Sequence, residues 1–362
     1  MGEGAVPPSR RRLFRRLRRA LGVLEERQRI QDIGYGLLVA ALTLALPSDP
    51  PYLAGDEAAR RLAGEADVLT QGLMFPLGRG LLETLPELDG ASAIRLLAAL
   101  ALGGAFTLTL AFLRGLGFRR TASLPAALAA FAVPYSWIGA TSPIDYAPGM
   151  MGASLLLWSL FRQEQGHRRG YHWRAILCFG IAYMLHLELA LLVPATAWAV
   201  SSHPAHRREA QVTGYAVLTV LVMSIAIGIA GPNESLRLDH LATRALGGAT
   251  GPDPASWLGW LTAAPVGFGV VLFGVYQLLI AQRSAGTRRA PAWMVPWSLA
   301  FLAPIVAGSP AAAPIAPYLI PAGALGIADW LNRQGSARQE LRLGAALVAA
   351  QVAATAAVVA LR

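Results

Sequence analysis

Charged residues are scarce in this chain, and one basic type is missing. Only 14% of the 362 residues are charged, whereas soluble domains carry about 25%. All 31 basic residues are arginine, so lysine is absent, and 55% of the chain is hydrophobic. These proportions exclude an ordinary soluble domain and predict an all-helical membrane protein with several spans.

Cysteine is nearly absent as well. The single Cys178 lies within an apolar run, which excludes a disulfide framework and a cysteine-based metal site. The sequence also lacks a Walker loop, a dinucleotide-binding glycine motif, metal-ligand spacing and a nucleophile elbow. We therefore expect no site of these classes.

The net charge of +10 comes from arginines at particular places. Nine of them precede residue 30, and most others lie in short loops between apolar runs. This distribution indicates membrane topology, and we expect no nucleic-acid partner. Within residues 9–30, apolar residues recur at helical spacing opposite the arginines, which predicts a cytoplasmic interfacial helix over residues 1–32. A disordered basic tail is the alternative.

Residues 33–362 form the expected transmembrane domain. Loops rich in arginine stay in the cytoplasm, so the alternation of apolar runs and arginine loops assigns the N-terminus to the cytoplasm and loop 47–91 to the outer face. We expect membrane-surface helices within that loop. Eleven spans result: 33–46, 92–113, 122–134, 147–161, 175–186, 188–200, 212–231, 264–281, 293–308, 316–332 and 343–361.

Residues 175–200 allow two interpretations. Arginines flank this stretch on both sides, at Arg174 and Arg207. Keeping both flanks in the cytoplasm favours two short helices that meet outside near His186, although a spanning helix usually needs about 17 to 25 residues. One long tilted helix is the alternative.

The outer loops hold the candidate acids. Asp56 and Glu57 follow a proline-rich turn after the first span, where partial desolvation suits a carboxylate to act as a general base. Asp145 lies alone at the outer end of the fourth span, and ionisable residues in such positions are commonly functional. A helix N-cap would explain Asp56 or Asp145 equally well.

Two further groups are candidates for substrate contact. His186 and Glu188 lie between apolar runs without another charge nearby, so they pair, face a cavity or mark an outer turn. We favour substrate contact over a purely structural pair. Arg237 and Arg244 lie in another outer loop and could clamp a phosphate, because a guanidinium group binds two phosphate oxygens at once. An amphipathic surface helix is the more common explanation of such arginines.

Several short segments follow one another along the chain in an order that is informative. They are Gly55-Asp56-Glu57 after the first span, Phe75-Pro76-Leu77-Gly78 before the second, Asp145, the paired helices around His186 and Glu188, and Ala316-Pro317-Tyr318-Leu319-Ile320-Pro321. In this order they resemble the membrane-embedded GT-C glycosyltransferases, the superfamily of protein O-mannosyltransferases and lipid A aminoarabinose transferases with its uncharacterised bacterial branches. Unlike these families, the segment after Gly72 has no His-Pro-Pro pattern, and no large soluble outer domain is present.

The resemblance implies transfer of a sugar from a polyprenyl-phosphate donor to an acceptor at the outer face of a bacterial inner membrane. It implies catalytic roles for Asp56, Glu57 and Asp145, with Asp56 as the base that takes the acceptor proton. It also implies that a second set of residues contacts the substrate: His186, Glu188, Arg237 and Arg244. One of the two arginines would hold the lipid phosphate. The resemblance does not specify the sugar, the acceptor, the need for a divalent cation or the oligomeric state.

Two other functions are also open. A membrane transporter could use His186 and Glu188 in a proton relay, although we see no internal repeat between residues 33–186 and 188–361. A non-catalytic subunit of a membrane complex could use the arginine-rich N-terminus as a docking arm. Convergence of the candidate carboxylates in space would favour an enzyme over a subunit.

Overall fold

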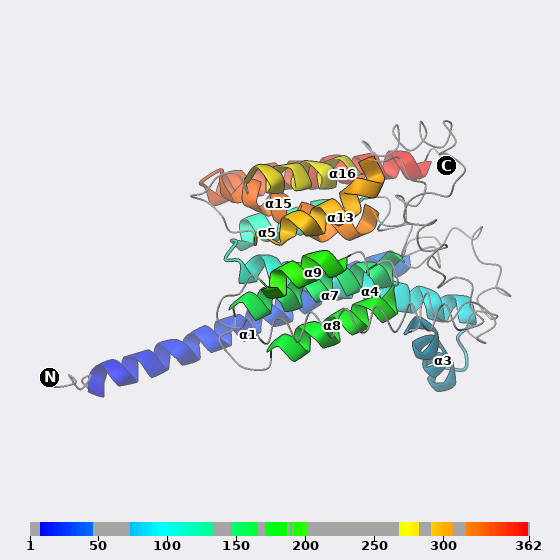
Figure 1. Ribbon diagram of the computed structural model, residues 1–362, viewed down its shortest axis with the longest axis horizontal. Helices are drawn as coiled ribbons and strands as arrows, with labels where there is room; N and C mark the ends of the chain where they lie inside the picture. The colour runs from blue at the N-terminus through cyan, green and yellow to red at the C-terminus, as the bar shows by residue number, and fades with distance from the viewer. Residues whose placement is uncertain are drawn as a thin grey trace.

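The structure is a computed structural model of a helical bundle (Figure 1). It describes residues 8–45, 73–133, 136, 146–165, 171–186, 189, 192–201, 268–281, 291–306 and 316–360. Every regular element within these residues is helical, so the predicted all-helical class is confirmed for them. The helices are α1 (Pro8–Ala45), α3 (Met74–Thr84), α4 (Gly90–Gly115), α5 (Arg120–Phe131), α7 (Tyr146–Gln165), α8 (Tyr171–Leu185), α9 (Val193–Ser201), the helix Phe268–Ala281, α13 (Met294–Val306), the short 3-10 helix η5 (Ala316–Leu319), α15 (Ile320–Asn332) and α16 (Ala337–Ala360).

Two of the described helices are long and apolar enough to cross a membrane, judged by length and composition. They are α4 and the Ala337–Ala357 part of α16, while the helix Phe268–Ala281 is apolar but shorter. Each predicted span overlaps a described helix in part, except 212–231, which lies outside the described residues. The predicted number of eleven crossings stays a prediction.

A glycine pair brings α1 and α4 into backbone contact. Gly36 and Gly103 face each other so closely that a Cβ atom on either would overlap the carbonyl oxygen of the other. Small residues allow helices in membrane proteins to approach in this way. Nearer the start of α1, Asp32 forms an ion pair with Arg114 near the end of α4, so the two helices run antiparallel.

The helices α5 and α16 run parallel although they are far apart in the chain. Thr121 in the first turn of α5 donates to the carboxylate of Glu340 in the first turn of α16. At the other end, Thr355 of α16 donates to the backbone oxygen of Ala132, which directly follows α5, at 2.5 Å. The last helix of the chain therefore packs along α5.

Over residues 32–45 of α1, polar side chains turn inward and most large apolar side chains turn outward. Asp32 and Thr43 are buried, whereas Leu37, Leu38 and Leu42 are half exposed or more. The helix is also continuous across the predicted boundary between an interfacial segment and the first span at residue 32. Its first half extends away from the bundle in Figure 1.

The same inverted polarity occurs on α16. Glu340, Gln351 and Thr355 are buried on the side that meets the bundle. From residue 345 onward, its exposed positions with described side chains are all alanine or valine: Ala345, Ala346, Ala349, Ala350, Val352, Ala353, Ala356 and Ala357.

Several helix ends whose sequences carry arginine lie at one end of the bundle, on the left in Figure 1. The ends of α4 and α7 lie together there, because the rings of Phe112 and Phe161 are 5.4 Å apart. Described arginines at the helix ends on this side are Arg114, Arg119, Arg120, Arg162, Arg174, Arg333, Arg338 and Arg342.

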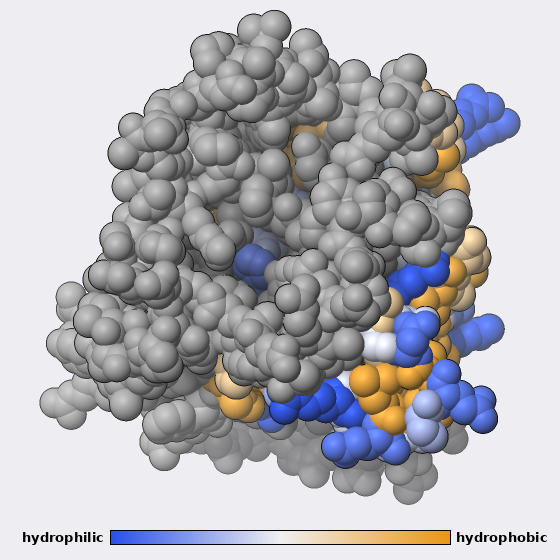
Figure 2. Space-filling view, turned by 90° about the vertical axis from the view of Figure 1, so that its right-hand side faces the viewer, coloured by the Kyte–Doolittle hydropathy of each residue, from blue (hydrophilic) through white to orange (hydrophobic). Residues whose placement is uncertain are grey.

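The opposite end carries the amphipathic helix α3, which lies across the bundle at the right of Figure 1. Exposed residues of α3 include apolar Leu77 beside polar Arg79 and Glu83. In Figure 2, which looks onto this end, the described residues that reach the surface are a mixture of apolar and hydrophilic types. Close to α3, Asp89 caps α4 by accepting a hydrogen bond from the Ser92 amide at 2.6 Å, and this bond lowers the pKa of the Asp89 carboxyl.

Residues 175–200 contain two helices, as predicted. The first, α8, ends at Leu185, and α9 begins at Val193. His186 directly follows α8 and lies in the break between them. The predicted location of this turn at the outer surface stays a prediction.

The contact between α1 and α4 predicts opposite effects for two neighbouring glycines. Gly36→Ala should lower the free energy of unfolding by about 1 to 3 kcal/mol, because the added methyl group forces the two backbones apart. Gly34→Ala is the matched control: a Cβ there meets nothing within 4 Å, and alanine favours a helix over glycine by up to about 1 kcal/mol. Thermal unfolding in detergent measures both, and equal effects of the two substitutions would contradict the proposed contact.

Candidate functional site

Only one of the predicted site residues lies in the described part of the chain. His186 is described. The others lie outside the described residues: Asp56, Glu57, Asp145, Glu188, Arg237 and Arg244. The candidate site is therefore built here from His186 and the described residues around it.

His186 is held at the end of α8. Its amide donates to the Ala182 carbonyl oxygen at 3.0 Å, which continues the helical pattern for one more residue. Its own carbonyl oxygen accepts from the Leu189 amide at 3.1 Å, so the chain turns immediately after it. The side chain is 9% exposed, although imidazole is a polar group that usually lies nearer the surface.

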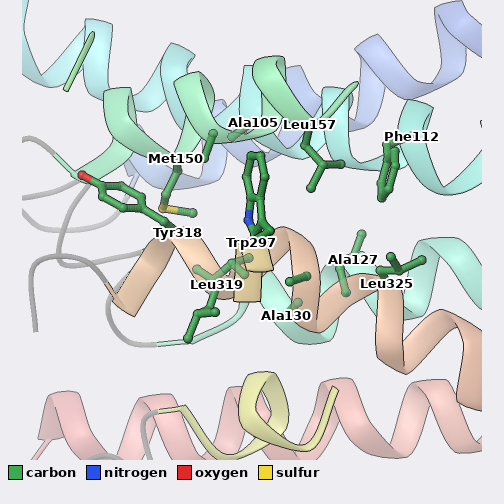
Figure 3. Packing of buried hydrophobic residues seen from close by; sticks show 14 of the residues in the cluster. Ala105, Phe112, Ala127, Ala130, Met150, Leu157, Trp297, Tyr318, Leu319 and Leu325 are labelled. Atoms are coloured by element: carbon green, nitrogen blue, oxygen red, sulfur yellow. The ribbon is translucent and has the colours of Figure 1, made fainter. Parts of the chain in front are cut away.

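The imidazole ring lies against Tyr318 of η5, and the two ring centroids are 5.5 Å apart. Gly149 in the first turn of α7 leaves the space that the phenol ring occupies, because a Cβ at this position would overlap Tyr318. Met150 lies beside the same ring in Figure 3. Three elements distant in sequence therefore meet at His186.

Tyr318 continues into a row of aromatic side chains on α13. Its ring centroid is 5.4 Å from that of Phe301, which is 6.4 Å from that of Trp297. Trp293 follows at 6.2 Å from Trp297. Trp297 and Phe301 are four residues apart and share one face of α13, and Trp293 directly precedes the helix with the same spacing. We call His186, Tyr318, Phe301, Trp297 and Trp293 the aromatic row.

The aromatic row is buried in the main core of the bundle. In Figure 3 the indole of Trp297 projects from α13 towards Ala105 of α4 and Leu157 of α7. Its indole nitrogen has no hydrogen-bond partner among the described residues, and neither has the hydroxyl of the neighbouring Ser298. A buried polar group without a partner costs about 1 to 3 kcal/mol, so these two groups are candidate contacts for a bound polar molecule.

A backbone contact joins the end of the acidic segment 47–91 that precedes α3 to this region. The Leu73 amide, just before α3, donates to the Met184 carbonyl oxygen at 3.2 Å. Leu73 is also the first described residue after the segment that holds Asp56. Leu73 therefore lies against the bundle two residues from His186.

The opposite end of the bundle is tied together by ion pairs. Asp32 and Arg114 join α1 to α4. The buried Glu340 accepts from Thr121, and its carboxylate lies 3.7 Å from the guanidinium group of Arg119. Each acid has a charged or hydroxyl partner on a neighbouring segment, so this cluster is better explained as a structural link between helices than as a catalytic site.

No three described His, Cys, Asp or Glu side chains are grouped so that they could hold a metal ion. The sequence interpretation missed Gly149 and the tryptophans of the aromatic row. A repeat of large aromatics every four residues, from Trp293 to Phe301, was the available signal for the tryptophans. The contact between Gly149 and Tyr318 has no local signal, because it joins residues far apart in the chain.

The packing at His186 predicts that substitutions of Gly149 and Tyr318 have coupled effects on stability. Gly149→Ala should destabilise the protein by about 1 to 3 kcal/mol, since the new methyl group displaces the Tyr318 ring. Gly180→Ala is the control, because a Cβ there meets nothing within 4 Å. In a thermal double-mutant cycle, Gly149→Ala should cost much less when Tyr318→Ala is also present. Strictly additive losses of stability in the double variant would contradict the contact between Gly149 and Tyr318.

No protein-family model, curated protein or solved structure matches this chain. Its function therefore has to be argued from the chemistry of its own side chains.

Proposed function

We propose that this chain is an integral protein of a bacterial inner membrane that crosses it about eleven times, with its N-terminus in the cytoplasm. The support is the inverted polarity of α1 and α16, whose polar residues lie between helices while apolar faces are exposed. Lipid favours this arrangement, because polar groups in a bilayer must find partners inside the protein. The arginine-bearing helix ends would then lie on the cytoplasmic side.

The proposed reaction is transfer of a sugar from a polyprenyl phosphate to an acceptor hydroxyl at the outer face. Asp56 accepts the hydroxyl proton, with Glu57 beside it, while the acceptor oxygen replaces the lipid phosphate on the sugar. Asp145 orients donor or acceptor. Arg237 or Arg244 binds the phosphate that leaves.

The observation that carries this proposal is the meeting of three chain segments at His186. The acidic loop returns to the bundle at Leu73, beside the end of α8. Asp145 is four residues from Gly149, and Glu188 is two residues from His186, so chain length keeps them within about 14 Å and about 7 Å of these positions. Asp56 precedes Leu73 by 17 residues, so its approach to the same region is part of the proposal.

A membrane transporter is the second candidate, favoured by the break between α8 and α9 at a buried histidine. Transporters often bind substrate where helices are interrupted. In that function His186 and Glu188 would exchange protons, and the acids at 56 and 145 would not be required for chemistry.

The topology predicts that two loops lie on opposite sides of the membrane. In a Cys178→Ser background, Ala63→Cys should react with an impermeant maleimide from outside intact cells. Arg168→Cys should react only after the cells are opened, because it lies in a loop rich in arginine. The Cys178→Ser protein alone is the unlabelled control, and labelling of both sites from one side would refute the topology.

The transfer mechanism predicts that Asp56→Asn keeps the shape of the site but removes the proton acceptor. Transfer from a polyprenyl-phosphate sugar should fall by a factor of about 100 to 10,000, with thermal stability little changed. Glu87→Gln is the matched control, because it neutralises an exposed carboxylate of the same outer loop.

Full transfer activity in Asp56→Asn would refute the catalytic assignment. Unchanged function in Asp56→Asn, together with loss of substrate uptake in His186→Gln, would favour the transporter. Equal losses in Asp56→Asn and Glu87→Gln would indicate an effect of loop charge rather than of a catalytic base.

A further inference from the structure

One face of α16 is charged at its start and apolar beyond it. Residues three or four positions apart form this face, and all of them are exposed: Arg338, Arg342, Ala345, Ala349, Val352 and Ala356. We call this set the outer face of α16. The opposite side of the helix packs on α5 through Glu340 and Thr355.

The two arginines on this face are not neutralised by the nearby acids. On α16, the carboxylate of Glu340 is buried and already contacts Thr121 and Arg119. On α15, Asp329 pairs with Arg333 at 2.8 Å. Two exposed guanidinium groups one helical turn apart therefore give a concentrated positive charge that suits a phosphate.

The apolar part of the outer face fits the dimensions of a lipid chain. The rise of 1.5 Å per residue makes the distance from Arg342 to Val352 about 15 Å. One leaflet of the hydrocarbon core is about half of 30 Å thick. A headgroup held at the arginines would therefore leave an acyl chain to run along alanine and valine to the middle of the bilayer.

We propose that the outer face of α16 binds an anionic phospholipid, with its phosphate between Arg338 and Arg342 and an acyl chain along Ala345, Ala349 and Val352. Charge complementarity at one end and an exposed apolar track at the other both favour a lipid over a soluble anion. The inference does not depend on the transfer reaction, because it uses none of the residues assigned to that reaction.

The test uses the full-length protein in detergent with added phosphatidylglycerol, phosphatidylcholine or inorganic phosphate. Phosphatidylglycerol should raise the Tm and remain bound in native mass spectrometry, while the other two should have little effect. Arg338→Gln/Arg342→Gln should weaken phosphatidylglycerol binding roughly thirty-fold, from the loss of two interfacial arginines. Arg162→Gln/Arg174→Gln, in the last turn of α7 and the first turn of α8, removes the same charge from exposed positions at the same end of the bundle and should leave the affinity nearly unchanged.

Each alternative result overturns the proposal. Equal stabilisation by phosphatidylcholine would indicate lipid binding without charge recognition. Stabilisation by inorganic phosphate alone would indicate an anion site without a lipid. Equal weakening in both double variants would indicate attraction by net charge rather than a site on α16.

Discussion

The bundle depends on polar side chains that are held between helices rather than on its perimeter. At one edge, Asp32 of α1 is buried against Arg114 of α4. At the other edge, Glu340 of α16 is fully buried beside Thr121 of α5. Removing one partner of a buried charge leaves the other without compensation, which is costly. These contacts therefore fix the rotation of both edge helices about their own axes and leave their apolar sides facing outward.

The two ends of the bundle differ in the contacts that their described residues make. Ion pairs join helices at the arginine end, where the connections between α4 and α5 and between α15 and α16 are short. At the other end, α8 and α9 are separated by the break that holds His186. Rigid helices commonly position functional residues that are carried by loops. The aromatic row includes His186 at this second end. It therefore provides a rigid, buried group of side chains on which loop residues can be positioned.

Much of the helix layout could be predicted from the sequence. Apolar runs bounded by arginine predicted 92–113 and 293–308, and the structure has α4 at Gly90–Gly115 and α13 at Met294–Val306. This works because hydrophobicity and charge along the chain are local properties. The break after α8 was also predictable, since arginines flank the stretch on both sides.

Other features could not be predicted, because they depend on contacts across the fold. The continuity of α1 through residue 32 follows from its packing on α4, to which no single stretch of sequence points. The meeting of Gly149, Tyr318 and His186 likewise joins three distant segments. For the candidate site, sequence reasoning placed His186 between two helices, and the structure has it buried at the break after α8. Its role in a site stays a prediction, as do those of the six other candidates.

The pairing of α5 with α16 has a consequence for biosynthesis. Thr121 and Glu340 are separated by 219 residues, which a ribosome adds in about 10 to 45 s at typical elongation rates of 5 to 20 residues per second. During that interval α5 is already made but lacks the helix that packs along it. Until α16 is made, α5 therefore lacks its packing partner. A chain released by a ribosome that stalls before residue 337 would contain α5, the third predicted span, without α16.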